Sequence, residues 1–212
     1  MKKETLYRIT QLVFILSSIY IMVKHLMLHN FSQAVLGPLS LLFLLIPPIA
    51  EKILKIKLTI ELKIMILLFS MFAFNFGTAL YWYHRIGIYD MVMHFLSGIV
   101  FSLIGFCLYT AFDTENPVDR KKNWLLQLTY ALFFSMFIAA IWEIGEYLGF
   151  VLFGNDTQHH LTTGVVDTME DIIACFLGSI LVCFDYFLYQ IKNKSFFTSI
   201  LVRFDQLNQK GK

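Results

Sequence analysis

The sequence predicts an all-α fold, a polytopic membrane helix bundle with about six transmembrane helices and both termini in the cytoplasm. Composition is the first observation behind this prediction, because 58% of the 212 residues are hydrophobic and only 15% are charged. Soluble domains carry about 25% charged residues. The mean hydropathy of +0.66 agrees with a chain whose main solvent is lipid. The same apolar fraction excludes intrinsic disorder, and a net charge of only +2 argues against nucleic-acid binding.

Six apolar stretches are the second observation. A helix needs about 20 mostly apolar residues to cross roughly 30 Å of hydrocarbon. The stretches that approach this length lie at about residues 9–29, 33–50, 62–83, 90–111, 124–150 and 167–191, followed by a tail at 192–212. The first is too long for the apolar core of a signal peptide, so we interpret it as a retained helix. With no repeat and no long linker, residues 1–212 are expected to form a single integral membrane domain.

The second stretch is the weakest of the six, because Gly37, Pro38, Pro47 and Pro48 interrupt it. Proline removes a backbone donor and kinks a helix, so a kinked or partly re-entrant segment is an alternative to a full span. The amphipathic stretch that follows, EKILKIKLTIELK, is expected to lie on the inner leaflet as a surface helix. The C-terminal tail has a similar pattern and the same expectation.

The third observation is the uneven distribution of lysine and arginine. If the N-terminus lies inside, 15 of the 17 basic residues fall on the cytoplasmic side, and only Lys24 and Arg85 fall near the other face. Cytoplasmic loops of membrane proteins carry this excess of basic residues. The distribution therefore predicts that both termini are cytoplasmic.

The outer half collects ionisable side chains of a different kind. All six histidines and seven of the 15 acids map there. They are His25, His29, His84, His94, His159 and His160, with Asp90, Glu143, Glu146, Asp156, Asp167, Glu170 and Asp171. Ionisable side chains at membrane depth cost several kcal/mol unless they are paired, so they usually face a bundle interior or a wet cavity. This distribution indicates a polar site at the outer boundary.

Three pairs of these residues each share one face of a predicted helix. The pairs are Asp90 with His94, Glu143 with Glu146, and Asp167 with Asp171. Residues three or four apart are neighbours on a helix, and counting span lengths puts all three pairs within about one turn of the same boundary. We therefore expect the pairs to converge. Five carboxylates without basic partners would repel one another, and a divalent cation would relieve that repulsion.

The main hypothesis is an outward-facing site for zinc or manganese, because carboxylates and imidazole are common ligands of these metals. The predicted metal ligands are Asp90, His94, Asp167 and Asp171, and the predicted catalytic carboxylates are Glu143 and Glu146. The alternative is a polar network in which Asp90 and Asp167 cap their helices and His94 hydrogen-bonds to a glutamate. His159 and His160 either join the site as mobile ligands or form an ordinary exposed pair.

The order and spacing of these motifs resemble a known family. An Asp-x3-His-Phe helix start, a glutamate-rich end on the next helix, and Asp-x3-Asp followed by Gly178 resemble the YjdF-like family of bacterial integral membrane proteins. The resemblance covers about residues 80–185 and extends more distantly to the VanZ-like family, associated with teicoplanin resistance. VanZ-like proteins typically have Glu-x2-Gln where this chain has Glu143-x2-Glu146, which favours the YjdF-like assignment. The resemblance implies a multi-pass protein of the bacterial cytoplasmic (inner) membrane and names no substrate.

Three functions fit the predicted site. The first is a metal-dependent hydrolase or transferase that acts on a lipid-linked or envelope substrate, with Glu143 or Glu146 as general base. The second is a non-catalytic envelope or antibiotic-tolerance factor that binds a lipid or a partner. The third is a proton or divalent-cation transporter. A path across the membrane needs matching polar residues in the inner half, and their scarcity there beyond Asp185 and Asn75 weighs against this function. The expected partners are membrane lipids and a lipid-linked small-molecule substrate, and no nucleic acid.

Overall fold

The computed structural model describes residues 2–112, 120–192 and 195–209. In these residues all regular structure is helical, and six helical segments are long and apolar enough to cross a membrane. They are Lys2–Met27, Phe31–Leu54, Ile60–Ala79, Tyr89–Phe112, Asn123–Phe153 and Val166–Lys192. The predicted all-α bundle with about six spans is therefore confirmed. The side of the membrane on which the termini lie stays a prediction. Three of the basic residues behind it, Lys194, Lys210 and Lys212, lie outside the described residues.

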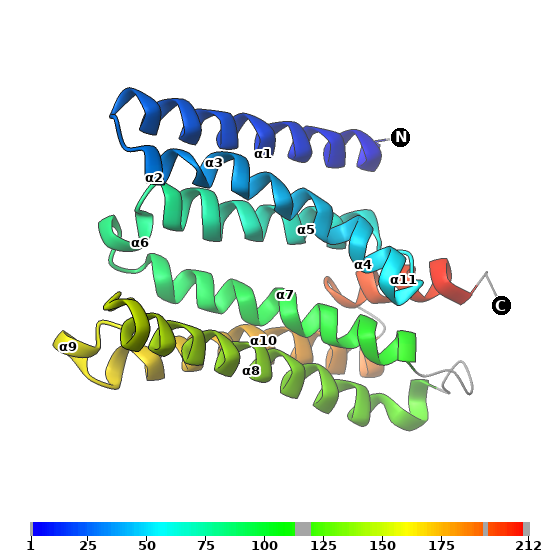
Figure 1. The fold of residues 1–212 in the computed structure, drawn as a ribbon. Helices are drawn as coiled ribbons and strands as arrows, with labels where there is room; N and C mark the ends of the chain where they lie inside the picture. The colour runs from blue at the N-terminus through cyan, green and yellow to red at the C-terminus, as the bar shows by residue number, and fades with distance from the viewer. Residues whose placement is uncertain (1, 113–119, 193–194, 210–212) are drawn as a thin grey trace. The chain divides into compact units, whose positions relative to one another are not determined.

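The chain folds into two compact units, Met1–Asp90 with Val202–Lys212, and Met91–Leu201. The first unit contains α1 (Lys2–Met27), α2 (Phe31–Ala34), α3 (Leu36–Ser40), η1 (Leu41–Leu45), α4 (Ile46–Leu54), α5 (Ile60–Ser70), η2 (Met71–Ala79) and α6 (Trp82–Arg85) (Figure 1). The second contains α8 (Arg120–Phe153), α9 (His160–Thr163) and α10 (Val166–Lys192). Two helices contain residues of both units. They are α7 (Tyr89–Phe112), which the division cuts near its start, and α11 (Thr198–Gln209).

The second span of the first unit is irregular, because it consists of four consecutive helical segments, α2, α3, the 3-10 helix η1 and α4. Pro47 and Pro48 lie in the first turn of α4, where the donor that proline lacks would be unpaired in any case. Gly37 allows α3 to approach α1 closely, since a Cβ added there would lie 2.9 Å from the Met22 backbone nitrogen. The glycine and prolines of the sequence therefore lie within the segments α3 and α4 of this irregular span.

A buried polar cluster holds three elements of the first unit together. Asn75 of the π-helical stretch η2 donates from Nδ2 to Ser17 Oγ at 2.7 Å and to Ser18 Oγ at 3.3 Å. Ser18 Oγ in turn lies 2.7 Å from Ser40 Oγ of α3. Hydrogen bonds between uncharged side chains, as in this cluster, join helices in a membrane without a buried charge. Asn75 therefore has a structural role inside its own unit.

Small residues allow close packing in the second unit. The buried residues of α8 recur at every fourth position, which aligns them on one face of the helix. They are Gln127, Ala131, Ser135, Ala139 and Glu143. Gly105 of α7 faces this row, because a Cβ added there would lie 2.9 Å from the Ala131 Cα. Membrane helices use such small side chains to bring their backbones together, and the row ends at Glu143.

Asp185 of α10 caps the start of α11. Its carboxylate accepts hydrogen bonds from the backbone N–H groups of Phe196, Phe197 and Thr198 at 2.8–3.0 Å, and from Thr198 Oγ1 at 3.0 Å. A carboxylate at a helix start satisfies unpaired backbone donors and interacts favourably with the helix dipole. These contacts give Asp185 a structural role at the start of α11.

Candidate metal site

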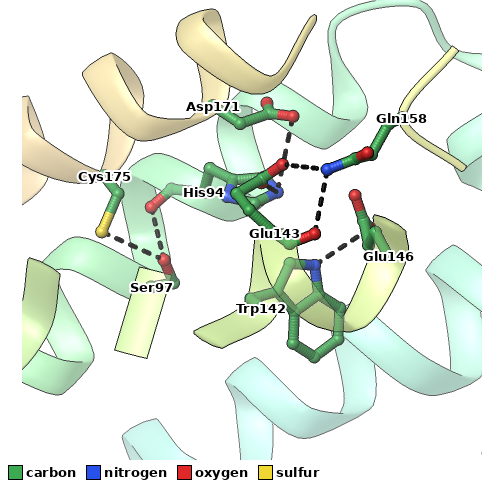
Figure 2. A network of polar contacts seen from close by, with 8 residues as sticks. All are labelled: His94, Ser97, Trp142, Glu143, Glu146, Gln158, Asp171 and Cys175. Atoms are coloured by element: carbon green, nitrogen blue, oxygen red, sulfur yellow. Dashed lines mark hydrogen bonds and ion pairs between the residues drawn. The ribbon is translucent and has the colours of Figure 1, made fainter. Parts of the chain in front are cut away.

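Three ionisable side chains from three helices of the second unit point toward one another (Figure 2). The Nε2 atom of His94 on α7 lies 3.7 Å from Asp171 Oδ2 on α10 and 4.0 Å from Glu143 Oε1 on α8. All three residues are buried. The predicted convergence is therefore observed for one member of each pair, and the polar site lies where α7 and α10 begin.

Asp90 completes a group with the donor chemistry of a metal site. It lies one helical turn before His94 on α7 and is half-buried. One ligand atom each from Asp90, His94 and Asp171 lie within 4.8 Å of one another. One imidazole and two carboxylates suit zinc, which in catalytic sites takes three protein ligands and one exchangeable position, and also manganese. The donor set therefore fits a divalent cation.

Two glycines bring α7 and α10 close enough to form this group. A Cβ added at Gly98 would overlap the Cys175 carbonyl oxygen, and one added at Gly178 would overlap the Phe95 carbonyl oxygen. Gly98 lies one turn after His94, and Gly178 lies two turns after Asp171. Because the two backbones touch at the glycines, the short Asp171 side chain comes within 4 Å of the His94 ring.

Hydroxyl groups connect the helices directly below the group. Ser97 Oγ donates to the His94 carbonyl oxygen at 2.6 Å and lies 3.7 Å from Cys175 Sγ (Figure 2). Ser135 Oγ lies 3.7 Å from the same sulfur, and Ser179 Oγ donates to Ser135 Oγ at 2.9 Å. These serines give no signal in the sequence, because serine is common in membrane helices. They tie α7, α8 and α10 together beneath the carboxylates.

Gln158 is a further residue that sequence reasoning missed. It lies in the connection between α8 and α10, yet it is buried. Its Nε2 atom donates to the Glu143 carbonyl oxygen at 2.9 Å and to Glu143 Oε2 at 3.0 Å (Figure 2). With Oε2 held by Gln158, the other carboxylate oxygen of Glu143 faces His94. A glutamine in a polar loop gives no sequence signal for this role, because only the folded loop brings it to Glu143.

Replacing Gln158 by methionine tests this contact. Methionine has a similar size but no donor, so the buried Glu143 oxygens lose both hydrogen bonds. Leaving buried acceptors without a donor costs about 1–3 kcal/mol, so Gln158→Met is expected to lower the thermal unfolding midpoint in detergent. Asn155→Ala, at an exposed position of the same connection, is the control and should leave the midpoint unchanged. Equal midpoints for Gln158→Met and wild type would show that the contact adds nothing to stability.

The remaining predicted site residues lie at different distances from this group. Glu146 accepts a hydrogen bond from Trp142 Nε1 of its own helix at 3.0 Å (Figure 2). Asp167 is half-buried in the first turn of α10, one turn from Asp171. His159 is exposed, and the side chain of His160 lies outside the described part of the chain. The metal-binding and catalytic roles of the predicted residues stay predictions.

Comparison with known proteins identifies the family of the chain. Residues 6–192 match the model of a family described as predicted membrane protein (DUF2238). The chain belongs to this family. The site residues from Asp90 to Asp171 lie inside the matched range, whereas α11 lies beyond it. No curated protein and no solved structure matches the chain. Family membership and the six apolar helices together identify a multi-pass membrane protein.

Proposed function

We propose that this membrane protein binds a divalent cation, zinc or manganese, and uses it for hydrolysis or group transfer on a lipid-linked or envelope substrate. The observation that supports this most is the group of Asp90, His94 and Asp171, whose ligand atoms lie within 4.8 Å of one another. Charged groups at membrane depth are costly and mark functional sites by default. Two acids and an imidazole in one small volume make a cation the natural ligand.

Glu143 is the proposed general base. A divalent cation in such a site supplies Lewis-acid activation of water and of a substrate oxygen. Glu143 Oε1, 4.0 Å from His94 Nε2, would accept the proton that an attacking water gives up. Gln158 holds the other oxygen of the same carboxylate, so Oε1 stays directed toward the ligand group. Glu146, whose contact is to Trp142, is the alternative base.

The proposed location is the bacterial cytoplasmic (inner) membrane, with the site on the outer side. The distribution of Lys and Arg supports this orientation, because the connections next to the site, residues 86–88 and 154–165, carry none. The likeness of the motifs to YjdF-like and, more distantly, VanZ-like proteins also supports a role in the bacterial envelope. An outward site at the membrane boundary is where the polar head of a lipid-linked substrate lies.

The test is turnover of lipid-linked phosphate and ester substrates by purified protein in lipid nanodiscs. Wild type loaded with zinc or manganese is expected to be active. Glu143→Gln is expected to keep the metal and lose activity by about a hundredfold or more, the size of a general-base contribution. Glu170→Gln, an exposed acid on α10, is the control and should stay active. Activity of Glu143→Gln equal to wild type would remove Glu143 from the mechanism.

A second candidate function, cation or proton transport, has one observation in its favour. Polar side chains continue away from the site through Ser97, Cys175, Ser135 and Ser179. Further along the same helices, the hydroxyl of Tyr186 donates to Gln127. Flux across liposome membranes that falls in Ser135→Ala but not in Glu170→Gln would favour transport. Wild type that binds lipid without turnover or flux would favour the remaining hypothesis, a non-catalytic envelope or antibiotic-tolerance factor.

A further inference from the structure

The connection between α8 and α10 exposes large apolar side chains, although connections between helices are usually polar. Phe153 at the end of α8 is 82% exposed, Leu161 of α9 is 75% exposed, and Val165 is 67% exposed. These residues continue an exposed apolar face on both sides of the connection. That face comprises Leu148, Val151 and Leu152 of α8 and Val166, Met169 and Ile173 of α10. The faces of α8 and α10 belong to membrane spans, so the apolar surface of the connection is continuous with a lipid-facing surface.

Several polar groups of the connection are bonded within it. Asp156 Oδ2 accepts from the Leu161 backbone N–H at 3.1 Å. The hydroxyls of Thr162 and Thr163 both donate to the His159 carbonyl oxygen at 3.0 Å, and their backbone N–H groups donate to the same oxygen. Unsatisfied backbone groups are what prevents a loop from entering lipid. Because these groups are bonded internally, the connection has a low cost of contact with a lipid surface.

One side chain of the connection points toward the carboxylate site and away from the exposed apolar surface. Gln158 is buried and donates both hydrogen bonds to Glu143, while Leu161, three residues later, is exposed. The connection therefore has an inner side at the carboxylate site and an outer apolar side.

We propose that the connection between α8 and α10 is a membrane-seated cover, with Leu161 and Val165 in the lipid interface and Gln158 against Glu143. The partner is the uncharged part of the bilayer surface, because residues 151–166 contain no lysine or arginine to attract anionic headgroups. Apolar side chains next to a polar face are the pattern of interfacial segments. This inference depends on the membrane character of the chain and not on a bound metal or on turnover.

The experiment places a fluorescent label at single cysteines in the full chain, reconstituted in phosphatidylcholine nanodiscs. The variants are Leu161→Cys and Val165→Cys, with Asn155→Cys as the matched control at an exposed polar position of the same connection. The native cysteines Cys107, Cys175 and Cys183 are buried, and labelled wild type measures their background. Spin-labelled lipids with the quencher at the headgroup or high on the acyl chain report contact with lipid, and iodide reports contact with water.

We expect the labels at 161 and 165 to be quenched by spin-labelled lipid at least about twofold more than the label at 155, as for interfacial residues. Adding phosphatidylglycerol should leave this ratio unchanged. A ratio below about twofold at both positions, with iodide reaching all three labels alike, would overturn the proposal. Quenching that appears only with phosphatidylglycerol would overturn the choice of an uncharged partner surface. The quenching ratios can be interpreted in the same way if the protein contains no metal or shows no activity.

Discussion

Wild-type protein purified in detergent is expected to carry about one zinc or manganese ion per chain, as in sites with three protein ligands. The variants His94→Ala and Asp171→Asn are expected to lose it, because each removes one of the three ligands that lie within 4.8 Å of one another. Binding should weaken by more than about a hundredfold, since changing residues that only orient a ligand already costs about 10- to 100-fold. Elemental mass spectrometry of the three proteins measures the metal content directly.

Glu170→Gln is the matched control for this prediction. Glu170 precedes Asp171 on α10 but is exposed, so removing its charge should leave the metal content unchanged. Added metal should also raise the thermal unfolding midpoint of wild type, because a ligand at a hundred times its Kd stabilises the folded state by about 2.7 kcal/mol. Asp171→Asn should show no such rise. Metal-free wild type with no thermal response would contradict the metal hypothesis and favour the capping network of Asp90 and Asp167.

The spans and the three polar pairs could be predicted from the sequence because both signals are local. Span length follows from consecutive apolar residues, and a shared helix face follows from a spacing of three or four. The pair Asp90 and His94 needed nothing more than this spacing to be placed together at the start of α7. The irregularity of the second span was also predictable in outline, since Gly37, Pro38, Pro47 and Pro48 are visible in the sequence.

Which residue of a pair lies beside the other site residues could be determined only from the fold. Glu143 and Glu146 have the same local signals, yet Glu143 is buried beside His94 and Glu146 accepts from Trp142. Which of them faces inward depends on how α8 is rotated against its neighbours, and that rotation is set by the small residues of its buried row. Gln158 could not be found from the sequence, because its contact with Glu143 is made by a loop that returns to the helix preceding it.

Close packing of α7 on α10 leads to the second large expected effect. Gly178→Ala is expected to destabilise the protein by at least about 2 kcal/mol, as overpacking of a tight interface does. The added methyl group would overlap the Phe95 carbonyl oxygen, which is backbone and cannot rotate away. For a chain of this length the thermal unfolding midpoint should fall by about 4–8 °C. Because relief of the overlap requires α7 and α10 to separate, His94 and Asp171 should also move apart and metal affinity should fall.

Gly145→Ala separates this overlap from the general effect of replacing glycine in a helix. Gly145 lies on α8 with no atom within 4 Å of an added Cβ, so the substitution adds a methyl group in open space. Alanine has the higher helix propensity, by about 1 kcal/mol, so Gly145→Ala should leave the midpoint unchanged or raise it, and should leave metal binding intact. If Gly178→Ala behaves like Gly145→Ala, α7 and α10 are not in backbone contact at this position. If Gly178→Ala lowers the midpoint and the metal affinity together, the glycine contact is what holds His94 within reach of Asp171.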